Sequence, residues 1–346
     1  MFFYNVDKKI PLHPFRILPI MAPTMNSEFA VILSKVHKTF PGKEPVLALR
    51  GVDLQVPKGI IFGFLGPNGA GKTTTLRILT TLLPFEQGNA YVAGIDVKQD
   101  PQAVRKMIGY VSQKGGADRA ATGRENLLLQ GRLYGLSSGE AIAQAESLID
   151  TFVLKDCIDR FVSTYSGGQR RRLDIALAMM HQPKIVFLDE PTNGLDPQSR
   201  DNLWSKILEL KERGVTIFLT SHYLDEVDAL ADSLAIMDHG KIVAEGTPEI
   251  LKQQISGDII TIGMQKNFHT HAMSLFGDKT SFLRDIHAKD QELRLYVDKG
   301  ASALPQILRL LDQASIQFET IQLSVPSLND VFLKQTGRSL RDEATS

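Results

Sequence analysis

One eight-residue segment, residues 66–73, restricts the possible folds of this chain more than any other. It follows the apolar residues 60–65 and matches the pattern G-x-x-x-x-G-K-[ST] at every position. The glycines permit a tight turn whose backbone N–H groups point at one anion, and a helix beginning there adds the positive end of its dipole. The segment therefore predicts a strand, a phosphate-binding loop and a helix in an α/β fold. Its residues are Gly66, Pro67, Asn68, Gly69, Ala70, Gly71, Lys72 and Thr73.

Side chains of this segment add to the predicted site. Lys72 supplies a positive charge for the β- and γ-phosphates of a nucleotide, and the Thr73 hydroxyl can ligate Mg²⁺. Thr74, the next residue of the helix, is counted among the predicted nucleotide contacts. The alternative is a glycine-rich turn that carries a lysine by chance, but it does not explain the order of strand, loop and helix.

A second segment predicts the position of a metal ion and of an attacking water. Residues 185–188 are apolar, as is typical of a buried parallel strand, and Asp189 and Glu190 follow them. Ligands bind beyond the carboxyl ends of such strands, so Asp189 is predicted to face Mg²⁺. Glu190 is then placed to orient or deprotonate water. The alternative, a strand that ends in an acidic turn, stays open for this segment alone.

Strand and helix patterns alternate along most of the chain, which predicts a mostly parallel sheet covered by helices. Over residues 114–182 the strands stop, and helical spacing predicts a helical subdomain inserted into the α/β core. Beyond residue 254 the order becomes β-α-β-β-α-β, the ferredoxin-like pattern, followed by a last helix. We thus expect a poorly structured extension over residues 1–27, an α/β domain over 28–254 and a small α+β domain over 255–346.

The overall composition excludes several functions. Lysine plus arginine and aspartate plus glutamate both number 39, and this neutral balance argues against nonspecific nucleic-acid binding, which needs excess positive charge. With Cys157 as its one cysteine, the sequence can build neither a disulfide framework nor a thiolate metal site. No stretch approaches the about 20 apolar residues that cross a hydrocarbon core. We therefore expect any membrane span to come from another chain.

A third segment shows which nucleotide-binding family the chain resembles. Tyr165 is followed by Ser166, Gly167, Gly168 and Gln169, and this run resembles the signature L-S-G-G-Q of ABC ATPases. Tyr165 replaces the usual leucine and leaves the Ser-Gly-Gly part intact. Ser166 is typical of a helix N-cap, and the glycines leave backbone N–H groups accessible to an anion. A capped helix start without a ligand explains the serine but not two adjacent glycines, which are poor helix formers.

The resemblance covers about residues 28–251 and implies further site residues. Phe40 resembles the aromatic residue that stacks on adenine, with a core phenylalanine as an equal alternative. Gln113 resembles the loop glutamine that reaches Mg²⁺ and the water. Asp196 resembles the aspartate that contacts the partner subunit, and His222 resembles the switch histidine that hydrogen-bonds the γ-phosphate. The implied catalytic residues are Lys72, Gln113, Glu190 and His222, and the implied Mg²⁺ ligands are Thr73, Gln113 and Asp189.

The resemblance also implies a function and partners. It predicts the P-loop NTPase fold of an ABC nucleotide-binding domain that binds ATP and Mg²⁺, hydrolyses ATP, and dimerises head to tail around two ATP molecules. A separate transmembrane permease would dock on the helical subdomain from the cytoplasmic side. Leu127, Leu128 and Leu129 are candidates for that contact, although three consecutive leucines cannot share one helix face.

The C-terminal end narrows the resemblance. Residues 326–333 and 336–342 resemble the tail of daunorubicin-resistance-type ATPases, which pair with six-helix permeases and export drugs, lipids or polysaccharides. This implies an exporter subunit, and a second dimer contact through residues 255–346 is left open. The alternative is a soluble ABC ATPase that acts on ribosomes or nucleic acid. A single cassette and the neutral charge disfavour it.

Overall fold

The computed structural model of the chain describes residues 28–255, 257–265, 268–277, 282–289 and 291–336. The extension expected over residues 1–27 and the end of the tail, residues 337–346, lie outside this range. No helix within the described part of the chain is long and apolar enough to cross a membrane.

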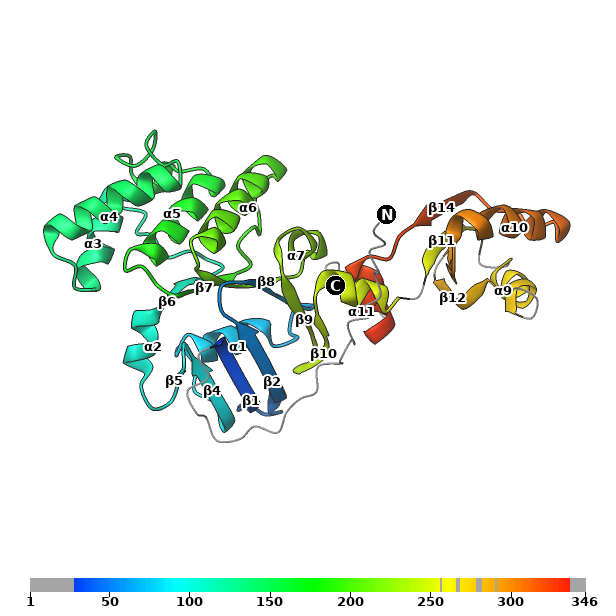
Figure 1. Cartoon of the computed structure of the whole chain (residues 1–346), viewed down its shortest axis with the longest axis horizontal. Coiled ribbons are helices and arrows are strands. Elements are labelled where there is room, and N and C mark those ends of the chain that lie inside the picture. Colours follow the sequence, from blue (N-terminus) through cyan, green and yellow to red (C-terminus); the bar gives the residue numbers. More distant parts are fainter. Residues whose placement is uncertain (1–27, 256, 266–267, 278–281, 290, 337–346) are drawn as a thin grey trace, which may run out of the picture.

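A six-stranded sheet forms the centre of the part of the molecule that carries the predicted phosphate loop (Figure 1). Its strand order is β10-β9-β3-β8-β7-β6, and all neighbours are parallel except β10 and β9. β3, β7 and β8 are buried along their whole length, as expected for apolar strands covered on both faces. The predicted parallel sheet is therefore confirmed. Its strands are β3 (Ile61–Leu65), β6 (Ile108–Val111), β7 (Ile185–Asp189), β8 (Thr216–Ser221), β9 (Ser233–Asp238) and β10 (Lys241–Gly246).

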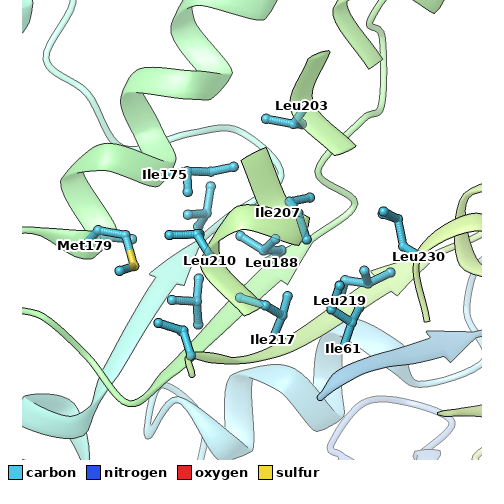
Figure 2. Packing of buried hydrophobic residues seen from close by; sticks show 14 of the residues in the cluster. Ile61, Ile175, Met179, Leu188, Leu203, Ile207, Leu210, Ile217, Leu219 and Leu230 are labelled. Atoms are coloured by element: carbon cyan, nitrogen blue, oxygen red, sulfur yellow. The ribbon is translucent and has the colours of Figure 1, made fainter. Parts of the chain in front are cut away.

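Successive residues of β3 point to opposite faces of this sheet. Ile61 and Leu65 pack in the cluster under α5, α6 and α7, whereas Phe62 and Phe64 pack in the cluster under α1. Figure 2 shows the first cluster, where side chains of α5 and α6 meet the strands. The covering helices are α1 (Lys72–Leu79), α5 (Gly167–Met179), α6 (Pro197–Glu212) and α7 (Leu224–Leu230).

An antiparallel sheet of order β2-β1-β4-β5 packs in the cluster that also contains Phe62 and Phe64. β1 and β2 also approach the phosphate loop, as described below. The strands are β1 (Phe29–Phe40), β2 (Val46–Pro57), β4 (Gln87–Val92) and β5 (Ile95–Asp96), and the helix α2 (Pro101–Met107) follows them.

The predicted helical subdomain is present and contains α3 (Gly123–Leu133), α4 (Ser138–Thr151), a 3-10 turn (Val162–Thr164) and α5. α3, α4 and α5 each begin with a capping box, in which the N-cap hydroxyl and the side chain three residues later bond to each other's backbone N–H. The three N-caps are Thr122, Ser137 and Ser166. In Figure 1 these helices lie together at the end of the molecule away from β11 to β14.

The C-terminal part confirms the β-α-β-β-α-β order. Its antiparallel sheet has the order β12-β13-β11-β14. Each β-α-β unit leaves room for one strand, so β13 fills the gap between β11 and β12, and β11 fills the gap between β13 and β14. α11 returns to pack on α7 and α8. The elements are α8 (Pro248–Gln253), β11 (Asp258–Gly263), α9 (His269–Gly277), β12 (Leu283–Lys289), β13 (Glu292–Val297), α10 (Gly300–Gln313), β14 (Thr320–Ser324) and α11 (Leu328–Thr336).

Candidate active site

The phosphate loop joins β3 to α1 at the carboxyl edge of the central sheet. Gly71, the N-cap of α1, has a φ of 111° and provides no side-chain cap. A Cβ on Gly66 would lie 2.2 Å from the carbonyl oxygen of Met237, and one on Gly71 would lie 2.8 Å from that of Ala48. Both positions therefore require glycine, and the N–H groups that a helix start leaves to other partners suit an anion.

Lys72 is buried, and its ammonium group lies against the loop. Its Nζ donates to the carbonyl oxygen of Gly66 at 2.6 Å and to that of Pro67 at 3.0 Å. Asn68 and Gly69 form the exposed tip of the loop. The positive charge that was predicted to meet phosphate thus lies at the base of the loop.

The residues on either side of Lys72 continue the loop into the first turn of α1. Ala70 is buried, and its carbonyl oxygen accepts a hydrogen bond from the backbone N–H of Gly240 at 2.9 Å. Thr73 is exposed and Thr74 is half-buried on the first turn of α1. The predicted phosphate-loop residues therefore form one continuous loop and helix start.

Asp189 ends β7 beside this loop. Its Oδ1 accepts hydrogen bonds from the Thr220 hydroxyl at 2.7 Å and from the Thr73 hydroxyl at 3.3 Å. The structure therefore brings together Thr73 and Asp189, two of the three predicted metal ligands, although they come from positions far apart in the chain.

Glu190 leaves the strand in a left-handed backbone conformation, with a φ of 46°. Non-glycine residues rarely adopt positive φ, and such strain collects at functional sites. The Glu190 backbone N–H donates to the Thr220 carbonyl oxygen at 3.2 Å, which holds the turn. Oε2 accepts from Gln113 Nε2 at 2.9 Å and from Asn193 Nδ2 at 3.2 Å, and Oε1 lies 3.2 Å from His222 Nδ1.

These contacts affect the charge of Glu190. The hydrogen bond with His222 is the largest influence and lowers the pKa of the Glu190 carboxyl, while partial burial opposes it. Lys72 lowers this pKa further by its positive charge. Glu190 is therefore a carboxylate at neutral pH. Asn193 was not among the predicted site residues, so its contact with Glu190 is a site feature that sequence reasoning missed.

The residues present fit a magnesium ion. Mg²⁺ takes oxygen ligands and usually keeps waters and substrate phosphates beside one or two protein ligands. The Thr73 hydroxyl and the Asp189 carboxylate face each other, and Gln113 lies on the adjacent loop with an amide oxygen. The described residues contain no cluster of three or more His, Cys, Asp or Glu side chains suited to a metal, and a nucleotide-bound Mg²⁺ does not need one.

The signature segment lies at the N-terminus of α5. Ser166 Oγ accepts from the Gln169 N–H at 3.2 Å, and Gln169 Oε1 accepts from the Ser166 N–H at 3.0 Å, so the predicted N-cap is confirmed. A Cβ on Gly168 would lie 2.8 Å from the Ser199 hydroxyl on α6. Packing of α5 against α6 thus gives a reason for Gly168 that needs no ligand. Gly167 is exposed, and a Cβ there would make only an ordinary contact.

Tyr165, which departs from the family pattern, and Asp196, which matches it, both make clear local hydrogen bonds. Tyr165 is buried, and its hydroxyl donates to the carbonyl oxygen of Cys157 at 2.7 Å, so the ring replaces leucine and also gains a hydrogen bond. Asp196 is the N-cap of α6, and its carboxylate accepts from the Ser199 N–H at 2.9 Å and from the Ser199 hydroxyl at 2.6 Å. The Ser199 hydroxyl is the main cause that lowers the pKa of Asp196.

Phe40 ends β1 in register with Val46 of β2. Ala48, two residues along β2, is the residue whose carbonyl oxygen borders Gly71. The Phe40 ring is 36% exposed, and Lys38 Nζ lies 5.4 Å from its centre. Phe40 is therefore not a core residue, and its stacking on adenine stays a prediction.

The three leucines that were candidates for a permease contact differ in exposure. Leu127 is fully buried, Leu128 is partly buried against the core, and Leu129 is 57% exposed. Leu127 is therefore a core residue, as expected for some of three consecutive leucines, and Leu129 stays the exposed candidate for the permease contact.

Comparisons with known proteins match both the α/β part and the C-terminal part of the chain. A family model described as "ABC transporter" matches residues 49–193, and one described as "ATP-binding protein DrrA1-3-like, C-terminal domain" matches residues 246–336. The chain is 40% identical over 317 residues to the daunorubicin/doxorubicin resistance ATP-binding protein DrrA of Streptomyces peucetius, covering 91% of this chain and 95% of that protein. It is 35% identical to the Nod factor export ATP-binding protein I of Paraburkholderia xenovorans, covering 91% and 99%.

Solved structures show the same cassette. The dimeric post-hydrolysis state of the ATP-binding cassette MJ0796 bound to ADP and Pi aligns with a TM-score of 0.58 at 26% identity. The alignment covers 63% of this chain and 98% of that one.

Proposed function

We propose a mode of action from one premise: this chain belongs to the ABC transporter family of ATP-binding proteins, in the group with a DrrA1-3-like C-terminal domain. It is the ATP-hydrolysing subunit of a transporter. A separate permease would provide the membrane span and hold this subunit on the cytoplasmic face. The relatives are named for daunorubicin and doxorubicin resistance and for Nod factor export, so we propose export of a drug, lipid or polysaccharide type of cargo. The relatives named here give no support to the ribosome or nucleic-acid alternative.

One observation carries the proposal: the phosphate loop, the Thr73–Asp189 pair and the Glu190 carboxylate meet at one edge of the sheet. Thr73 on α1 contacts Asp189 at the end of β7, and Glu190 next to it contacts His222 at the end of β8. Ligands of open parallel sheets bind at this edge. In the proposed complex, the loop N–H groups and Lys72 hold the phosphates of ATP, and the Phe40 ring stacks on the adenine.

Thr73, Asp189 and Gln113 are the residues that would hold Mg²⁺. When bound, the ion would neutralise negative charge on the β- and γ-phosphates. The Thr220 hydroxyl already donates to Asp189 Oδ1 at 2.7 Å, so this carboxylate is oriented before any ion arrives.

Glu190 is proposed to hold the attacking water. Its ionised carboxylate can accept a hydrogen bond from water and take its proton as the oxygen attacks phosphorus. Gln113 and Asn193 donate to Oε2, and His222 Nδ1 lies 3.2 Å from Oε1, so contacts at both oxygens restrict the carboxylate. His222 would also hydrogen-bond the γ-phosphate, which links the two reacting groups.

The signature segment is proposed to act on the nucleotide of a second copy. Gly167 is exposed at the start of α5, where backbone N–H groups and the helix dipole favour an anion. Asp196 is exposed at the start of the neighbouring α6 and would contact the partner subunit. Two copies placed head to tail would then enclose two ATP molecules.

A groove between the helical subdomain and the sheet is the proposed docking site for the permease. Its cavity of about 310 Å³ lies between α3, α5, β6 and the end of α1. Leu82 and Tyr134 line it and are 51% and 39% exposed, and Arg105 adds a positive charge at its edge. The groove adjoins Gly115 and Gly116, close to Gln113, so a permease segment there would contact the loop that reaches the active site.

Two measurements test the proposed function. Purified chain should release phosphate from ATP in a Mg²⁺-dependent reaction, and Lys72→Ala should abolish it. The chain should be recovered with membranes when a six-helix permease is co-expressed and not without it. Recovery with ribosomes or DNA, independent of any permease, would refute the transporter role.

A further inference from the structure

Arg171 joins three segments of the active-site region. It lies on α5, and its guanidinium donates from Nε to the Pro191 carbonyl oxygen at 2.8 Å, from Nη1 to that of Ser112 at 2.7 Å, and from Nη2 to that of Asp189 at 2.8 Å. The residue is 6% exposed. Only the rigid planar fork of arginine places donors on three sides at once.

The three carbonyls flank the proposed catalytic residues. Ser112 directly precedes Gln113, and Asp189 and Pro191 stand on either side of Glu190. The guanidinium therefore fixes the backbone on both sides of Glu190. It also fixes the backbone next to Gln113, whose side-chain amide donates to Glu190.

Asp174, nearly one turn further along α5, holds the other end of the same loop. Its Oδ1 accepts from the backbone N–H groups of Gly116 at 2.9 Å and Ala117 at 3.1 Å. The loop that carries Gln113 is thus held at residue 112 by one α5 side chain and at residues 116 and 117 by another. Asp174 is also 6% exposed, so Arg171 and Asp174 are both buried charged residues. Burying a charge costs free energy, and packing alone does not explain why the fold accepts that cost twice.

We propose that Arg171 is a positioning residue for ATP hydrolysis, which couples the signature end of α5 to Gln113 and Glu190. The roles of those two residues rest on the proposed function. Ser166 to Gln169 stand at the start of the same helix, about one turn before Arg171. One helical turn and the Arg171 side chain therefore connect an anion bound at the helix start with the Glu190 carboxylate. Movement of α5 relative to the sheet would therefore shift Gln113 and Glu190 together.

Arg171→Lys tests this coupling in the full chain. Lysine keeps the positive charge, but one nitrogen on a flexible stem cannot reach three carbonyls in fixed directions. We expect kcat for Mg-ATP hydrolysis to fall about 10-fold or more, because small misplacements of reacting groups have large effects. The KM, and the Kd from titration with a fluorescent ATP analogue, should stay within about twofold.

A second pair of variants guards against a folding defect at Arg171. Asp174→Asn keeps the acceptor oxygen for Gly116 and Ala117 and should retain kcat, whereas Asp174→Ala removes it and should lower kcat. If Arg171→Lys does not fold, wild-type kcat in Asp174→Ala overturns the proposal.

Arg124→Lys is the matched control. Arg124 lies on α3 of the same subdomain and pairs with Glu146 and Asp159, away from the carbonyls described above. It should leave kcat unchanged while lowering the melting temperature modestly. Arg171→Lys with the kcat of an active wild type would refute the positioning role alone, and a parallel loss of kcat and ATP affinity would show a merely structural role. Wild-type chain without any ATPase activity would instead refute the proposed function.

Discussion

His222 Nδ1 lies 3.2 Å from Glu190 Oε1, which connects the ends of the neighbouring strands β8 and β7. The opposite oxygen of the same carboxylate accepts from Gln113 and Asn193. Glu190 is thus held by three side chains from three loops, in a strained backbone conformation with a φ of 46°. Strain of this kind persists where the surrounding contacts determine the geometry, and it fixes the side chain in advance of the reaction.

Glu190→Gln should separate nucleotide binding from hydrolysis. Glutamine keeps the shape of the side chain but cannot take a proton from water, so kcat should fall about 100-fold or more. ATP binding should persist, and the variant should accumulate as an ATP-bound dimer in size-exclusion chromatography with Mg-ATP. Glu212→Gln, at the exposed end of α6, is the control and should behave as wild type. Hydrolysis by Glu190→Gln at the wild-type rate would show that another group activates the water.

Gly66→Ala should damage both folding and ATP binding. The new Cβ would lie 2.2 Å from the backbone carbonyl oxygen of Met237, which cannot move without shifting β9. We expect a loss of about 1–3 kcal/mol in the free energy of unfolding, as for other overpacked sites. Gly139→Ala on α4 is the opposite control, because a Cβ there meets nothing within 4 Å and alanine favours a helix. Urea denaturation midpoints measure both effects, and equal midpoints would contradict the steric argument.

Apolar runs predicted the buried strands well, but short helices defined by their caps were missed. Strands β3 and β7 follow the apolar runs at residues 60–65 and 185–188 to within one residue. α2 (Pro101–Met107) and α8 (Pro248–Gln253) were not predicted. Each begins with a side-chain N-cap and a proline and buries few residues, so local capping defines these helices where an apolar stripe is too short to be seen.

The residue types at the site were readable from the sequence, but the contacts among them were not. The phosphate loop carries a strong local signal, whereas the Asp189–Glu190 pair gains its meaning only beside that loop, and the structure brings the two together. Asn193 and Arg171 act through hydrogen bonds to a distant carboxylate and to backbone carbonyls. Such bonds leave no periodicity or motif in one sequence, because they depend on distances that only the fold sets. For Phe40, exposure in the fold argues against the core reading, and stacking on adenine stays a prediction.

Glu226→Gln should stabilise the protein increasingly as the pH rises. Glu226 is fully buried on α7, and burial raises the pKa of its carboxyl, although the Ser221 hydroxyl donates to it at 2.6 Å and opposes the shift. The folded state therefore binds this proton more tightly than the unfolded state. The Glu226 carboxyl contributes to the free energy of unfolding of the wild type, and this contribution is fully present below the ordinary glutamate pKa. It is lost as the pH rises through the pKa of Glu226 in the folded state.

The glutamine variant lacks this proton, so its advantage in the free energy of unfolding should be near zero at about pH 4 and should grow toward neutral pH. Urea denaturation of both proteins across this range measures the difference, with the acid end as the internal reference. An advantage that is constant with pH would mean that the ionised form of Glu226 is not disfavoured by the fold.

Leu82→Glu should uncouple this chain from its permease without affecting its chemistry. Leu82 lines the groove beside α3 and is 51% exposed, so a charge there costs the isolated chain little but would be buried without a partner in a docked complex. Ile142→Glu is the matched control, because Ile142 on α4 of the same subdomain is 52% exposed and does not line the groove. Basal phosphate release should be unchanged in both variants. Recovery with permease-containing membranes should fall about 10-fold or more for Leu82→Glu alone, as for the loss of a central contact residue. Equal recovery of the two variants would place the permease contact on another surface of the helical subdomain.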